Sequence, residues 1–134
     1  MAAIRRRHAR SQALARLQGW VADPATAAPD ISGLHPADVA DVLWLDFEDE
    51  EARKLFRAMS EEQAAAVLAE SELKHQAALL EGADPALIGR LLGRLPADDA
   101  TDLLDELPES VRLEAMCFVT PEDAADIRHL AEYG

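Results

Sequence analysis

The sequence is poor in cysteine and in aromatic residues. Among its 134 residues are one cysteine, three phenylalanines, two tryptophans and one tyrosine. A single cysteine, Cys117, cannot form an internal disulfide, and we therefore expect a reducing, cytoplasmic setting. The apolar neighbours of Cys117 predict a small core residue and not a reactive thiol.

Long hydrophobic runs are absent as well. No stretch approaches the roughly 18 apolar residues that a membrane-spanning helix needs, so any function at a membrane requires a partner or a segment outside this sequence. The arginine-rich start is followed by no apolar stretch and no cleavage site, which excludes a secretory signal. Hydrophobic residues still make up 49% of the chain and are mainly alanine and leucine, a composition that favours helices over strands.

Positive charge is scarce outside the first 22 residues. These residues contain five arginines and no acid, whereas the whole chain has a net charge of −13. An acidic body repels nucleic acid and suits a cation or a basic partner surface.

The usual signatures of catalysis are also missing. We find no glycine-rich phosphate loop, no nucleophile elbow and no Ser/His/Asp arrangement. The four histidines, His8, His35, His75 and His129, have no His-x-x-x-His spacing, so zinc is not expected. We therefore predict that the protein is not an enzyme.

What the sequence does contain is a repeat. Residues 34–43 (LHPADVADVL) are echoed by residues 95–104 (LPADDATDLL) and by residues 119–128 (VTPEDAADIR). Unit starts fall near residues 34, 46, 59, 71, 83, 95, 107 and 119, a step that fits a short helix plus its link. Such helices become stable by stacking on neighbours, which predicts an all-α, superhelical (solenoid-like) array of helical hairpins.

Before the repeat, residues 3–22 have helical spacing, and residues 23–33 have the composition of a linker. We expect a first region at residues 1–33 and a helical-repeat domain at residues 34–134.

The repeat also predicts helix starts and a core. Pro36, Pro85, Pro108 and Pro121 fall where a first-turn proline is tolerated, and Ser60 with Gln63 forms a candidate capping box. Trp44 and Phe47 are expected to pack at the first hairpin corner. The predicted core consists of Val39, Val42, Leu43, Leu55, Phe56, Val67, Leu68, Leu79, Leu80, Leu91, Leu92, Leu103, Leu104, Leu113, Met116 and Ile127.

One group of carboxylates is a candidate metal site. Asp98, Asp102 and Asp105 lie at i, i+4 and i+7, on one face of a helix that starts near Pro96, with Asp99 and Glu106 beside that face. Like charges at this spacing are costly unless a cation or solvent relieves them, and magnesium prefers oxygen ligands. The residues fit either a magnesium site or a solvated acidic helix face.

A denser acidic run lies at residues 46–51, where Asp46, Glu48, Asp49, Glu50 and Glu51 precede Arg53, Lys54 and Arg57. This order predicts a solvated, ion-paired start of a helix.

The ordered series of repeats resembles the cytosolic N-terminal domain of MgtE-type magnesium transporters. The matching stretches are residues 34–43, more loosely residues 95–108 (LPADDATDLLDELP), and the closing residues 121–126 with 130–134. The resemblance implies a cytosolic regulatory domain that binds Mg²⁺ jointly with a pair of CBS domains, next to a membrane pore in the same or another chain. By the same resemblance, Asp98, Asp99 and Asp102 match the acidic helix of an ion-binding interface.

Two features depart from the resemblance. The chain stops at Gly134, about where the family continues toward its CBS domains, and Ala66 stands where the family can carry an acidic ion ligand. The alternative function is therefore a stand-alone helical-repeat scaffold for protein interaction. It would be similar to the domain of flagellar motor-switch proteins and would not sense ions.

Overall fold

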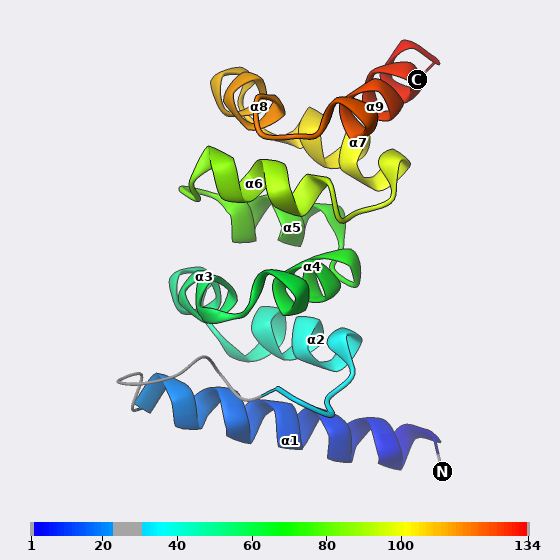
Figure 1. Ribbon diagram of the computed structural model, residues 1–134. Coiled ribbons are helices and arrows are strands. Elements are labelled where there is room, and N and C mark those ends of the chain that lie inside the picture. The colour runs from blue at the N-terminus through cyan, green and yellow to red at the C-terminus, as the bar shows by residue number, and fades with distance from the viewer. Residues whose placement is uncertain (1, 23–30, 134) are drawn as a thin grey trace. The chain divides into compact units, whose positions relative to one another are not determined.

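The computed structural model describes residues 2–22 and 31–133, and the side chains of residues 9–22 and 31–129 within them. This part of the chain is all-α (Figure 1), and strands are absent from it. Its helices are α1 (Ala2–Ala22), α2 (Pro36–Asp46), α3 (Asp49–Ala58), α4 (Glu61–Ala69), α5 (Leu73–Leu80), α6 (Pro85–Leu92), α7 (Ala97–Glu106), α8 (Glu109–Met116) and α9 (Pro121–Tyr133).

The helices from α2 onward follow the predicted step. They begin at residues 36, 49, 61, 73, 85, 97, 109 and 121, so successive starts are about 12 residues apart. Most contain only 8 to 11 residues, a length that is marginal in isolation. Their stability therefore depends on packing against neighbouring helices.

Side chains at the helix starts explain where several of these helices begin. The Nδ1 atom of His35 accepts a hydrogen bond from the Ala37 backbone N–H at 3.1 Å, which caps α2. Ser60 and Gln63 form the predicted capping box of α4, with donor–acceptor distances of 3.1 and 3.3 Å. The prediction for the prolines also agrees with the structure. Pro36, Pro85 and Pro121 are the first residues of α2, α6 and α9, and Pro108 occupies the N-cap of α8.

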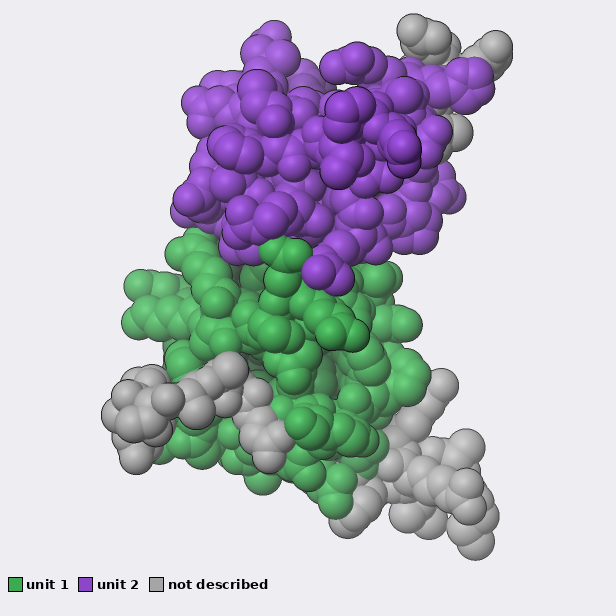
Figure 2. All heavy atoms as spheres, viewed as in Figure 1, with its two compact units in different colours: residues 1–71 green, residues 72–134 purple. Residues whose placement is uncertain are grey.

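The chain divides into two compact units, residues 1–71 and residues 72–134 (Figure 2). In the first unit, α1 packs on α2, and α2 packs on α4. Ala13 and Leu17 are the fully buried residues by which α1 covers this end of the core.

The last residues before α2 lie against α1. Residues 23–30 lie outside the described residues. Ile31 is buried, and its carbonyl accepts a hydrogen bond from the Leu34 backbone N–H at 3.1 Å. Arg16 of α1 donates from Nη1 to the Ser32 carbonyl at 2.7 Å. Residues 31–33 therefore form part of a turn that is hydrogen-bonded to α1.

In the second unit, alternate helices stack on one another. α5 packs on α7 and α7 on α9, while α6 packs on α8 (Figure 1). This alternation gives two layers of helices, the arrangement expected for stacked helical hairpins. At the contact between α6 and α8, Gly89 is buried, and a Cβ atom built on it would lie 2.6 Å from the Ala115 carbonyl oxygen.

Most of the predicted core is buried, with two exceptions on α8. Leu113 is 63% exposed, and Met116 is only partly buried. The prediction for Cys117 is also wrong, because this residue is exposed. The physical reason is that α8 buries Ala115 toward α6, its main packing partner among the described helices, so the Leu113 face of α8 has no comparable neighbour there.

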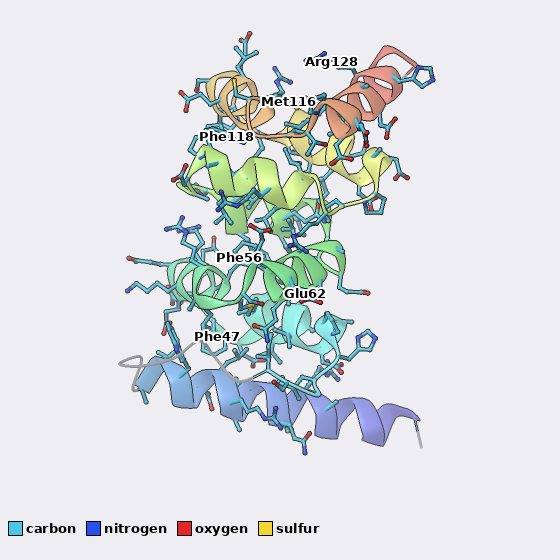
Figure 3. All side chains as sticks on the ribbon, in the orientation of Figure 1. Phe47, Phe56, Glu62, Met116, Phe118 and Arg128 are labelled. Carbon is cyan, nitrogen blue, oxygen red and sulfur yellow. The ribbon has the colours of Figure 1, made fainter. Side chains whose placement is uncertain are left out.

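The corner around Trp44 is also more open than predicted. Trp44 keeps 39% of its surface exposed, and Phe47 is partly exposed. Neither ring is enclosed in the core, whereas Phe56 on the following helix is (Figure 3).

Candidate functional site

The candidate site is the exposed side of α7. This helix buries Ala100, Leu103 and Leu104, which lie at i, i+3 and i+4 and form a single apolar stripe. Its acidic residues lie off that stripe, so Asp98, Asp99 and Asp102 are all exposed to solvent.

The backbone of α7 is held in place from its buried side. The Thr101 hydroxyl donates to the Ala97 carbonyl at 2.7 Å and also lies 3.5 Å from the Ile127 carbonyl of α9. Asp98 and Asp99 occupy the first turn, where negative charge complements the positive end of the helix dipole. The carboxylates thus project from a supported helix and not from a loop.

The three carboxylates do not form a closed metal cage. Across the described residues, no three His, Cys, Asp or Glu side chains converge closely enough to hold a metal ion together. Asp98 and Asp102 share a face, whereas Asp99 lies about a quarter turn away around the helix. The surface can therefore attract a hydrated cation and supply one or two ligands, and other groups would have to complete the coordination.

Asp105, the next acidic residue on this face, is close to a basic side chain. One of its carboxylate oxygens lies 3.9 Å from Nη1 of Arg112 on α8. The Asp105 side chain is well exposed and that of Arg112 is partly exposed, so the pair contributes little stability, but it partly offsets the charge at that end of the face.

The five acidic residues of the dense run at residues 46–51 are all exposed. Asp49, Glu50 and Glu51 form the first turn of α3. The predicted solvated start of a helix is confirmed, whereas its ion pairing with Arg53, Lys54 and Arg57 stays a prediction.

Ala66 lies on α4, in the other compact unit, and is partly buried. Glu62 and Glu70, one turn before and one turn after it, are both exposed (Figure 3 labels Glu62). The ridge that carries Ala66 therefore still holds two carboxylates, which sequence reasoning based on position 66 alone did not consider.

A further hollow of about 370 Å³ lies in the first unit. It is lined by Arg10 of α1 together with His35, Ala37, Asp38 and Asp41 of the α2 start. Among the described residues, the lining has the guanidinium of Arg10 and the carboxylates of Asp38 and Asp41, so the positive charge offsets only part of the negative charge. The sequence could not indicate this hollow, because α1 and α2 are brought together only by folding.

Comparison with known proteins places the chain in a family. The profile described as MgtE intracellular N domain matches residues 34–134. No curated protein matches the chain significantly. None of the helices in residues 2–22 and 31–133 is long and apolar enough to span a membrane.

Among solved structures, the chain is similar to one described as the crystal structure of the soluble part of a magnesium transporter. The two share 15% sequence identity with a TM-score of 0.44, over 93% of this chain and 50% of the other. The chain thus spans about half the length of that relative. Because the family profile covers most of the sequence, the chain belongs to the MgtE intracellular N domain family.

Proposed function

We propose that the protein is a regulatory, non-catalytic cytosolic domain of a magnesium transporter or channel. In this proposal it senses Mg²⁺ through Asp98, Asp99 and Asp102 at an interface with CBS domains. The CBS domains and the membrane pore would lie in the same chain or in another one.

The observation that carries the proposal is the incomplete acidic surface of α7 within a domain of this family. Its three carboxylates are exposed and supported from behind, yet too few converge to enclose an ion. An ion that keeps several waters and uses one or two carboxylates from each side suits such a surface.

The proposed mechanism is electrostatic. Without Mg²⁺, the α7 carboxylates would repel an acidic partner surface, and the two domains would separate. Bound Mg²⁺ would bridge carboxylates from both sides and favour the docked state in proportion to its differential affinity for the two states. The docked state would correspond to the closed transporter.

The test is association with a purified pair of CBS domains from a magnesium transporter, followed by calorimetry at constant ionic strength. We expect binding in 10 mM MgCl₂ and its loss in EDTA. The Asp98→Asn/Asp102→Asn variant should lose the magnesium-dependent part. The matched control is Glu50→Gln/Glu51→Gln on α3, which removes the same charge from an exposed helix start and should bind normally.

The same experiment also distinguishes ion sensing from the alternative function, a helical-repeat scaffold. Association that is equally strong in EDTA, or that is unchanged in the Asp98→Asn/Asp102→Asn variant, would contradict ion sensing by α7. Binding that is independent of magnesium would instead favour the helical-repeat scaffold.

A further inference from the structure

A groove in the second unit lies at the turns that join its helices. Its volume is about 460 Å³, and its walls are the end of α5, the α5–α6 turn, and the α7–α8 turn with the start of α8. The volume lies in the range of about 300–1,000 Å³ that is typical of pockets that enclose small ligands.

Small residues create the groove. Ala77 and Ala78 at the end of α5 and Ala83 in the following turn leave the space that larger side chains would occupy. Gly82 allows the turn itself, because its φ of 74° is unfavourable for other residues. The opposite wall consists of Leu107, Pro108 and Val111, so the interior is apolar.

Hydrogen bonds fix both walls of the groove. The Ala83 backbone N–H bonds the Leu80 carbonyl at 3.0 Å, and the Leu107 N–H bonds the Leu104 carbonyl at 3.1 Å. These bonds lie within the turns themselves, so the groove is largely formed before any ligand arrives.

The charge around the groove selects the kind of occupant. The ionisable residues that line it are Glu81 and Glu106, both exposed carboxylates. The unit that contains it, residues 72–134, has 14 acidic residues against 5 lysines and arginines, a formal net charge of −9. A second copy of this chain or an anionic surface would be repelled, whereas a cationic partner would be attracted.

We propose that this groove docks a basic amphipathic helix of a partner protein. One bulky apolar side chain would enter the apolar interior, and lysine or arginine side chains on either side would lie against Glu81 and Glu106. Helix-in-groove recognition of this kind needs apolar anchors on one helix face and complementary charge around them. The interaction requires no metal ion, and it therefore goes beyond magnesium sensing.

The test uses a fluorescein-labelled model helix of leucine and lysine as the probe, with fluorescence anisotropy in 50 mM KCl and EDTA. We expect saturable binding with a one-to-one stoichiometry. A control peptide with alanine in place of leucine keeps the positive charge but lacks the apolar anchor. It should bind at least tenfold more weakly. A second control peptide, with glutamate in place of lysine, has the opposite charge and should not bind.

Two variants locate the binding. Ala78→Leu fills the groove without disfavouring the helix and should weaken binding at least tenfold. Glu81→Gln/Glu106→Gln should weaken it severalfold and reduce its dependence on salt. The control Glu50→Gln/Glu51→Gln, with the same loss of charge in the other unit, should bind like the original chain.

If Ala78→Leu fails to fold, amide chemical-shift mapping on the unaltered chain provides the same information. The largest shifts should fall at Ala77, Ala78, Ala83 and Val111. Three outcomes would overturn the proposal. The control variant could weaken binding as much as the groove variants do, the chemical shifts could change elsewhere, or the alanine peptide could bind as strongly as the leucine peptide. A dimer that Ala78→Leu dissociates would identify a second copy as the occupant and would also overturn it.

The result is separable from the magnesium experiment. Asp98→Asn/Asp102→Asn leaves the groove lining intact and should keep at least half of the peptide affinity in EDTA. Loss of one function therefore does not imply loss of the other.

Discussion

Gly89 shows how strongly a single residue can constrain the packing of two helices. A Cβ atom at this position would lie 2.6 Å from the Ala115 carbonyl oxygen and 2.6 Å from Cβ of Phe118. One of these atoms belongs to the backbone, so relief would require α6 and α8 to move apart.

Replacing Gly89 by alanine should therefore destabilise the protein by about 1–3 kcal/mol, although alanine is the better helix former by about 1 kcal/mol. Urea denaturation followed by circular dichroism measures this change. Gly19 is the control, because a Cβ there meets nothing within 4 Å, and Gly19→Ala should be neutral or stabilising. A stabilised Gly89→Ala variant would show that α6 and α8 are not in close contact.

Leucines on two successive helices also differ sharply in their surroundings. Leu103 is fully buried on α7, whereas Leu113 on α8 is 63% exposed. Leu103→Ala should cost about 2–5 kcal/mol, and Leu113→Ala should remain within about 0.5 kcal/mol. The two free energies of unfolding come from parallel urea titrations, and similar losses in both variants would mean that α8 is covered on its Leu113 side.

At the scale of the element, each short helix depends on its ends. α4 has nine residues, and its capping box satisfies two backbone groups through Ser60 and Gln63. Ser60→Ala should cost about 1 kcal/mol, and Ser60→Asp should retain most of the stability, because aspartate is also a good N-cap. Thermal melts of the two variants check this, and equal stability of Ser60→Ala and the original chain would contradict it.

The elements are also where sequence reasoning was most informative. The helix starts could be predicted because a proline, acids or a capping residue mark the start of most repeats, and each has a local physical effect. Ile31 was missed, since its burial depends on the turn toward α1 that the surrounding linker composition does not reveal.

The failures on α8 have a different cause. Apolar periodicity shows which residues could face a neighbour, but it does not show whether a neighbour is present on that side. Leu113 and Met116 were therefore assigned to the core from their helical spacing, and Cys117 from its apolar neighbours. Likewise, the sequence predicts that Asp98, Asp99 and Asp102 are exposed, but metal binding depends on groups outside the helix and remains a prediction.

At the scale of the whole molecule, the net charge of −13 governs behaviour in salt. Like charges repel one another more in the compact state than in the unfolded chain, and salt screens this repulsion. Raising KCl from 20 to 500 mM should therefore raise the melting temperature by a few degrees. Scanning calorimetry measures the effect, and a lower melting temperature in high salt would indicate that attractive ion pairs dominate instead.

This screening must be separated from any specific effect of magnesium on the isolated chain. At constant ionic strength, a site with a dissociation constant of about 1 mM would stabilise the fold by about 1.4 kcal/mol in 10 mM Mg²⁺, or about 4 °C. We expect a shift no larger than this, because the site is incomplete without a partner. The Asp98→Asn/Asp102→Asn variant should lose the shift, because it lacks two of the carboxylates. An equal shift in that variant would place the ion elsewhere.

The stacking of alternate helices has a consequence for how the chain reaches its native state. In the second unit, α6 begins 24 residues before its partner α8, and α5 begins 24 residues before α7. Closing loops of this size costs little entropy, and the rate of folding rises as contacts become more local. Any pair of hairpins can thus serve as a nucleus to which the next helix adds, so the unit can begin to acquire structure during synthesis, before its last helix has been made.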